Sequence, residues 1–268
     1  MILGISSYTY PWAVGIPGYI PEHPMTETGL VRKASELSVG LIQLADNLPL
    51  HQMNHDRLDQ LCREATMNGI RLEAGARGMT EEHLHRYIKL AEKIGSPLLR
   101  FVIDDQDKFR PGSDEILSII RNAMNDLSSR NITLALENYE RMEAFEFAQI
   151  IKKLDSGFVG ICLDTINSLG AFEGTETVVE RLAPYTVNLH IKDARIFRTA
   201  HRLGYMVEGT PAGEGMLPLR RILERLTTRC KSAVLEQWVP PERKIEETIM
   251  KEDAWARKSI RNLKIYFP

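Results

Sequence analysis

The chain has 268 residues, of which 34 are lysine or arginine, 36 are aspartate or glutamate and 43% are hydrophobic. The near balance of charges, without a long basic run, does not favour a nucleic-acid partner. The first residues lack the pattern of a signal peptide, and no stretch reaches the roughly 20 apolar residues needed to cross a bilayer. We therefore expect a cytoplasmic protein that acts on a small molecule and has no nucleic-acid or membrane partner.

Eight short apolar runs along the chain have the length and composition of buried strands. Segments with apolar residues at helical spacing separate them. This alternation predicts parallel strands covered by helices, and eight such units favour an α/β fold with a single (β/α)8 TIM-barrel domain over residues 1–268. A doubly wound sheet is the alternative, but GISSYTYPW after the first run is not the Gly-rich phosphate turn which that fold needs. The predicted strands are 2–6, 40–44, 71–74, 98–103, 133–137, 159–164, 187–190 and 233–236.

Four of these strands finish in a residue that can bind a divalent cation. Glu137, Asp164, His190 and Glu236 come at the carboxyl ends of the last four predicted strands. In a barrel those ends are neighbours on one rim, so we expect the four side chains to share one ion. Three carboxylates and one imidazole suit Mn²⁺, Mg²⁺ or Co²⁺, and Zn²⁺ can also bind them.

The segments LALENYE, CLDTINS, NLHIKD and VLEQW contain these four residues and resemble the metal motifs of the xylose-isomerase-like TIM-barrel superfamily. That superfamily includes sugar isomerases, ketose 3-epimerases, inosose dehydratases and zinc-dependent AP endonucleases. The resemblance implies that Glu137, Asp164, His190 and Glu236 hold the metal, and that the two glutamates also act as catalytic acid and base on opposite faces of the substrate. Residues 205–217 lack the further histidines of the nucleases, which argues against DNA repair.

The resemblance also suggests two substrate-binding residues. Glu143 follows Glu137 at the spacing of a substrate-binding glutamate in the ketose epimerases. Asn167 stands where many relatives have a histidine, which argues against an epimerase that binds its substrate through that histidine.

Other candidates for substrate binding lie near the predicted rim. Residues 194–217 form a long connection, interpreted as a wall or lid of the site, in which Arg198 and His201 could bind a carboxylate or phosphate. Lys192 or His201 would steady a carboxylate, although the side chain of Lys192 could point away from the face of His190. Polar residues after the second and third strands are candidate hydroxyl binders, namely Gln43, Asp46, Asn47, Glu73 and Arg77.

Two related reactions fit such a site. An isomerase or epimerase polarises a carbonyl with the metal so that a carboxylate can remove a neighbouring proton, which leaves a metal-stabilised ene-diolate. A decarboxylase reaches a similar intermediate by losing CO₂, and SSYTYPWAVGIPG, LEAGARG and LDTINSLG resemble the branch that contains a 3-oxo-isoapionate decarboxylase.

We therefore predict a metal-dependent enzyme of carbohydrate catabolism that acts on a small keto sugar or keto sugar acid. Sugar isomerase or epimerase is the leading class. The alternatives are a decarboxylase of a 3-oxo sugar acid and a non-catalytic sugar-binding barrel, and a homo-oligomer remains open.

Overall fold

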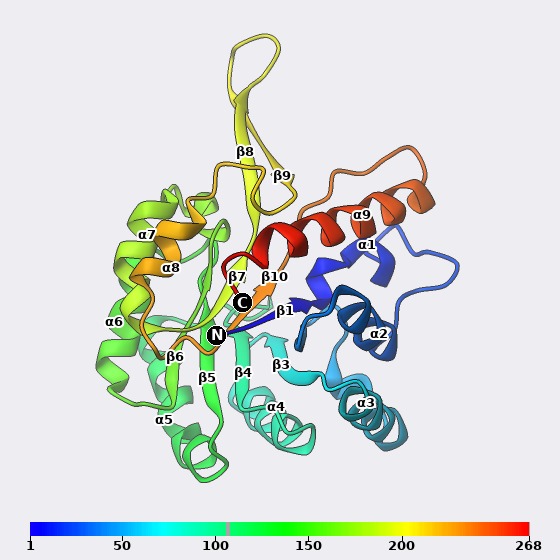
Figure 1. Cartoon of the computed structure of the whole chain (residues 1–268). Coiled ribbons are helices and arrows are strands. Elements are labelled where there is room, and N and C mark those ends of the chain that lie inside the picture. The colour runs from blue at the N-terminus through cyan, green and yellow to red at the C-terminus, as the bar shows by residue number, and fades with distance from the viewer. Residues whose placement is uncertain (106–107, 268) are drawn as a thin grey trace.

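The computed structural model describes residues 1–105 and 108–267, and within them eight parallel strands close a barrel (Figure 1). The predicted TIM-barrel fold is confirmed. The doubly wound alternative is wrong, because the sheet closes in the order β1, β10, β7, β6, β5, β4, β3, β2 and back to β1. The barrel strands are β1 (Ile2–Ser6), β2 (Leu41–Leu44), β3 (Arg71–Arg77), β4 (Leu98–Val102), β5 (Thr133–Glu137), β6 (Val159–Asp164), β7 (Thr186–Ile191) and β10 (Ser232–Leu235).

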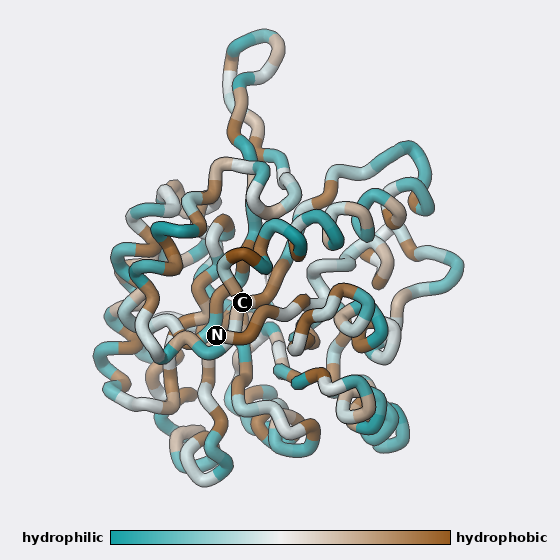
Figure 2. The backbone as a smooth tube through the Cα atoms, viewed as in Figure 1, coloured by the Kyte–Doolittle hydropathy of each residue, from teal (hydrophilic) through white to brown (hydrophobic). Residues whose placement is uncertain are grey.

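Helices cover the outside of the barrel, each with one apolar face. In α5, Ile116, Ile120 and Ala123 are fully buried against the sheet while the opposite face is polar. Figure 2 shows this division, with brown strands at the centre and teal turns on the outer helices. Among the described residues, no helix has the length and apolar character that crossing a membrane requires. The helices are α1 (Pro11–Val14), α2 (Glu27–Leu37), α3 (His55–Met67), α4 (Glu81–Lys93), α5 (Ser113–Ser129), α6 (Ala144–Leu154), α7 (Thr175–Leu182), α8 (Leu219–Arg225) and α9 (Ile245–Leu263).

The strand register decides which side chains meet at the rim. Asp164 of β6 is the partner of His190 in β7, and His190 is also the partner of Val234 in β10. Glu137 of β5 pairs with Cys162, two residues before Asp164. The carboxyl ends of β5, β6, β7 and β10 therefore lie side by side.

The connection after β7, predicted as a long connection over residues 194–217, has regular structure of its own. It contains an antiparallel hairpin made of β8 (Asp193–Arg198) and β9 (Tyr205–Thr210), which projects beyond the barrel rim (yellow in Figure 1). Residues of high strand propensity face one another here, such as Ile196 and Val207. At the base of the hairpin, the carboxylate of Asp193 accepts hydrogen bonds from the backbone N–H groups of Gly213 (2.9 Å) and Gly215 (3.0 Å). Asp193 is therefore an anchor for the hairpin.

Candidate active site

The four predicted metal ligands converge at the carboxyl end of the barrel. Nδ1 of His190 lies 3.4 Å from Oε1 of Glu236 and 3.5 Å from Oε2 of Glu137. It lies 4.0 Å from Oδ2 of Asp164. All four side chains are at most 1% exposed. Because the strands are parallel neighbours, residues distant in the chain form one buried cluster.

The chemistry of this cluster fits a divalent cation. Nδ1 of His190 is buried and has no hydrogen-bond partner within the described ranges, although carboxylate oxygens surround it. Asp164, His190 and Glu236 offer ligand atoms that all lie within 4.8 Å of one another, and Glu137 and His190 do the same together with Cys162. Ligands held about 2.1 Å from one ion lie roughly 3–4 Å apart, which is the spacing around His190 Nδ1. Asp164, His190 and Glu236 could therefore hold an ion, with Glu137 at its edge.

Two buried cations offset the negative charge of the carboxylates. Nζ of Lys192 lies 2.7 Å from Oδ2 of Asp164 and 2.9 Å from Oε2 of Glu236. Arg100 of β4 donates a hydrogen bond to Oε2 of Glu137 and, through Nη1, another to Oδ1 of Asp46 at 3.0 Å. Burial acts to lower the pKa of Lys192, but the neighbouring carboxylates outweigh burial and raise it above its usual range. Lys192 is thus an ammonium at neutral pH.

The surroundings shift the pKa values of Glu137 and Glu236 in opposite directions. Burial raises the pKa of Glu137, even though Arg100 opposes the shift. Burial also acts on Glu236, but nearby cationic groups such as Lys192 outweigh it and hold the pKa of Glu236 below its usual range. Burial lowers the pKa of His190 to about 4, so its ring is neutral at neutral pH. A neutral imidazole is the form that binds a metal.

Two of the predicted substrate-binding residues lie in the site. Asn167 donates from Nδ2 to Oε1 of Glu137 at 2.9 Å and accepts a hydrogen bond from Nζ of Lys192 at 3.2 Å. The expectation that Lys192 could point away from His190 is wrong, because the Lys192 ammonium and Nδ1 of His190 both lie beside the carboxylates of Asp164 and Glu236. Lys192 follows His190 by two positions, and its ammonium reaches the same carboxylates.

The structure does not bring the other three predicted substrate-binding residues into the cluster. Glu143 is exposed and caps the first turn of α6. Arg198 ends β8, where its guanidinium lies 4.7 Å from the centre of the Tyr205 ring, and His201 is exposed at the tip of the same hairpin. Because residues 193–210 pair as a hairpin, Arg198 and His201 at its outer end are held away from the pocket, and neither lines it.

A pocket of about 280 Å³ opens above the cluster. Arg77, Arg100 and Lys192 supply positive charge to its wall, and Glu137 and Glu236 reach it from the cluster. Aromatic side chains complete the wall, including Tyr8, Tyr139 and Trp238. Its size and mixed polar and aromatic lining suit a small sugar or sugar acid.

Arg100 is a buried residue of this candidate site that sequence reasoning missed. It is 2% exposed and links Glu137 to Asp46, which also accepts hydrogen bonds from Tyr8 Oη (3.0 Å) and Arg77 Nε (3.2 Å). The available signal was one arginine in an otherwise apolar strand, LLRFV. A buried guanidinium needs a carboxylate partner, so such an arginine indicates an ionic network.

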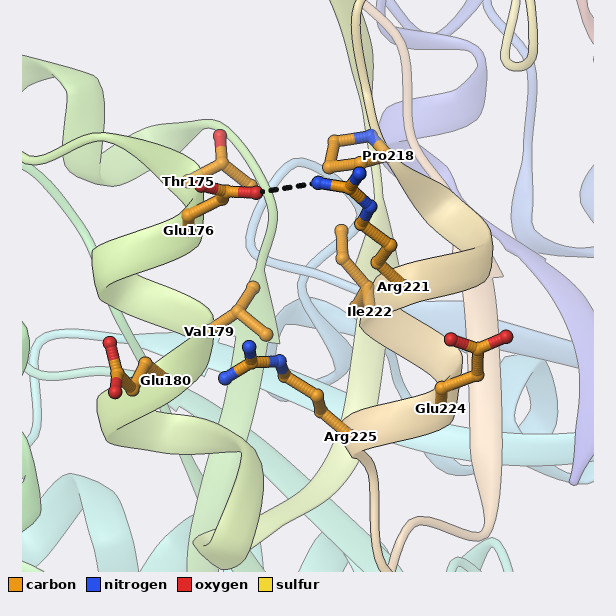
Figure 3. Close-up of a pocket in the computed structure, with 9 residues that line it drawn as sticks. All are labelled: Thr175, Glu176, Val179, Glu180, Pro218, Arg221, Ile222, Glu224 and Arg225. Atoms are coloured by element: carbon orange, nitrogen blue, oxygen red, sulfur yellow. Dashed lines mark hydrogen bonds and ion pairs between the residues drawn. The ribbon is translucent and has the colours of Figure 1, made fainter.

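A separate depression of about 320 Å³ lies between α7 and α8 on the outside of the barrel (Figure 3). Its polar residues are surface charges, and Arg221 pairs with Glu176 at 3.1 Å while both side chains are at least 75% exposed. The charged side chains of this depression are exposed to solvent on the outside of the barrel, whereas those of the carboxylate cluster are buried at its mouth.

Comparison with known proteins agrees with the geometry. Residues 31–266 match the family model described as xylose isomerase-like TIM barrel. The chain is 30% identical over 265 residues to a 3-oxo-isoapionate decarboxylase of Pectobacterium atrosepticum, and the match covers 98% of this chain and 95% of that protein.

Solved structures share the architecture at low sequence identity. A D-psicose 3-epimerase in the presence of D-fructose has a TM-score of 0.73, is 15% identical, and the alignment covers 99% of each chain. A xylose isomerase-like TIM barrel protein from Mycobacterium smegmatis in complex with magnesium has a TM-score of 0.69 and is 16% identical, with 98% of this chain and 97% of the other covered. These likenesses concern the fold.

Proposed function

The chain belongs to the xylose isomerase-like TIM-barrel family, and from this premise we propose that it is a divalent-metal-dependent decarboxylase of a 3-oxo sugar acid. One observation carries the proposal. The pocket above the carboxylate–imidazole cluster has three cationic side chains in its wall, Arg77, Arg100 and Lys192, beside the carboxylates of Glu137, Glu140 and Glu236, and the cations offer partners to an anionic sugar. The similarity of the whole chain to a 3-oxo-isoapionate decarboxylase supports the same substrate class.

The residues of the cluster have distinct tasks in this proposal. Glu137, Asp164, His190 and Glu236 would hold the ion. When bound, a divalent cation supplies Lewis-acid charge that stabilises negative charge developing on a carbonyl oxygen. Lys192 and Arg77 would orient the substrate carboxylate toward the wall of the pocket. Trp238 lies over Lys192, with 5.6 Å between Nζ and the ring centre, and helps to exclude water.

The proposed reaction breaks one carbon–carbon bond. The carboxylate leaves as CO₂, and the bonding electron pair moves toward the neighbouring ketone to give an ene-diolate. One proton must then be added to the carbon that lost the carboxylate, so a keto sugar acid and a proton become a ketose and CO₂. Glu137 lines the pocket and is placed to deliver this proton. Asn167 holds the carboxyl group in position by donating from Nδ2 to Oε1 of Glu137 at 2.9 Å.

A sugar epimerase or isomerase is the second candidate. Glu137 and Glu236 lie at nearly equal distances from His190 Nδ1, 3.5 and 3.4 Å, and come from strands on opposite sides of β6 and β7. Two carboxylates that flank a substrate can remove a proton from one face and return it to the other.

The test is a panel of 3-oxo sugar acids and neutral keto sugars, scored separately for CO₂ release and for isomer formation. We expect CO₂ from an acid, loss of activity after treatment with a chelator, and recovery with Mn²⁺ or Mg²⁺. Isomer formation from neutral sugars without CO₂ would favour the second candidate. Sugar binding without turnover of any substrate would indicate a non-catalytic barrel, and activity that is indifferent to chelation would refute the metal site.

A further inference from the structure

Inside the barrel, beneath the carboxylate cluster, hydrogen bonds connect Glu73 of β3 to His190 of β7. The link is Gln43 of β2, whose Oε1 lies 2.7 Å from Nε2 of His190 and whose Nε2 donates to Oε2 of Glu73 at 3.0 Å. Gln43 and His190 are fully buried, and Glu73 is 4% exposed. Because little or no solvent reaches these side chains, their hydrogen-bond partners are other groups of the protein.

The partners of Gln43 determine which way its amide points. Its Nε2 faces two acceptors, Oε2 of Glu73 and, at 3.2 Å, Oδ1 of Asn188. Asn188 is itself held, because its Nδ2 donates to Ser232 Oγ at 2.8 Å and lies 3.4 Å from Oε2 of Glu73. An amide nitrogen only donates, so Nε2 of Gln43 must stay on this side and Oε1 must face His190.

The orientation of Gln43 then decides the tautomer of His190. An amide oxygen only accepts, so Nε2 of His190 carries the proton and Nδ1 keeps its lone pair. Without this acceptor the tautomer with the proton on Nδ1 would become more populated. Glu137 and Glu236 lie 3.5 and 3.4 Å from Nδ1 and could accept a hydrogen bond from an Nδ1–H group. A protonated Nδ1 cannot bind a metal ion.

We propose that Glu73 is a positioning residue which, through Gln43, holds His190 in the tautomer that offers an unprotonated Nδ1 to a divalent ion. The inference rests on the proposed function, since it concerns residues deeper in the barrel, Glu73 and Gln43, that would hold the proposed metal ligand His190 in place. Partners of this kind typically contribute roughly 10- to 100-fold to metal affinity. Glu73 does not line the pocket above the cluster, and Gln43 stands between it and His190.

The experiment measures the tautomer of His190 and the affinity for Mn²⁺ separately. Histidine labelled with ¹⁵N reports which ring nitrogen carries the proton in the ion-free protein at neutral pH, and the signal of His190 is assigned by its absence in His190→Gln. We expect Nε2–H in the wild type. Glu73→Leu removes the acceptor, so the Nδ1–H form should grow and Mn²⁺ should bind roughly 10- to 100-fold more weakly by titration calorimetry.

Two variants control for general loosening of the barrel. Glu73→Gln keeps an acceptor oxygen of the same size and should retain the wild-type tautomer and most of the Mn²⁺ affinity. Ile42→Ala loosens β2 beside Gln43 without touching the hydrogen bonds, and should lower stability but leave the tautomer unchanged. A role of Glu73 that is only structural would make Glu73→Leu resemble Ile42→Ala.

The proposal is overturned if His190 of the wild type carries its proton on Nδ1, whatever the variants do. It is also overturned if Glu73→Leu changes neither the tautomer nor Mn²⁺ binding. If the wild type shows Nε2–H and Glu73→Leu shifts it, but no variant binds Mn²⁺, the positioning role stands and the proposed metal-dependent function fails.

Discussion

The ammonium of Lys192 lies 2.7 Å from Oδ2 of Asp164, in a part of the barrel mouth where both side chains are buried. A lysine at this point partly neutralises three carboxylates in the ion-free protein. It also lines the pocket, so the same charge is available to a substrate carboxylate. The proposed function depends on this combination of acidic cluster and cationic wall.

Glu236→Gln tests the role of the cluster in turnover. The substitution removes one proposed ligand charge and a possible proton acceptor, so we expect turnover to fall by roughly 10²- to 10⁴-fold while the protein remains folded. Initial rates with the best substrate, together with circular dichroism, check this. Glu247→Gln, at an exposed position of α9, is the matched control and should leave the rate unchanged. Full turnover by Glu236→Gln would remove Glu236 from the mechanism.

Arg77→Gln tests recognition of an acidic substrate. Arg77 lines the pocket with its side chain 33% exposed, so loss of its charge should raise KM for a keto sugar acid by roughly 10- to 100-fold and leave binding of a neutral keto sugar unchanged. Arg198→Gln makes the same chemical change on the exposed hairpin and should have no effect on either substrate. Equal loss on acid and neutral sugars in Arg77→Gln would contradict a role in charge recognition.

Arg100→Met tests the ion pairs beneath the pocket. Removing this buried guanidinium leaves Glu137, which is 1% exposed, without its cationic hydrogen-bond partner, and leaves Asp46 with Arg77 alone. We expect the free energy of unfolding to fall by roughly 3–5 kcal/mol, measured by chemical denaturation. Arg221→Met breaks a pair in which both side chains are at least 75% exposed (Figure 3), and should change it by about 0–1 kcal/mol. Similar losses in the two variants would show that Arg100 is not a buried structural cation.

Glu73 predicts a pH dependence of stability. Burial raises its pKa from the ordinary 4.5 to about 7, so the folded protein favours the protonated acid. The stabilisation is present below pH 4.5 and is lost as the pH rises through 7. Relative to Glu73→Gln, which does not titrate, the wild type should lose up to about 3 kcal/mol of unfolding free energy across this window. A difference between the two proteins that does not vary with pH would contradict the shift.

Much of the fold could be predicted because each strand carries its own apolar signal. The strand ends also placed Glu137, Asp164, His190 and Glu236 together at one rim, since parallel strands of a barrel finish on the same side. The direction of the Lys192 side chain could also be predicted. Side chains of a strand alternate between its two faces, and continuing that alternation two residues past His190 places Lys192 on the same face.

Other parts of the site depend on contacts that spacing along the chain does not encode. The role of Arg100 follows from its partners, which are Asp46 in the loop after β2 and Glu137 on the neighbouring strand β5, 54 and 37 positions away in the chain. The hairpin within residues 194–217 was not predicted, because its arginines interrupt the apolar alternation that marks a strand. Glu143 was predicted to bind substrate, but a glutamate at this spacing can also cap a helix, and here it is the residue that precedes and caps α6.

The hairpin leaves and re-enters the rim at one place, since Asp193 of β8 pairs with Thr210 of β9. Its length can therefore change by whole residue pairs without altering the register of any barrel strand. The outer part of this arm can be lengthened, trimmed or redecorated on its own, whereas its inner end is tied to the pocket, because Gly209 lies against Trp238, which lines the pocket wall.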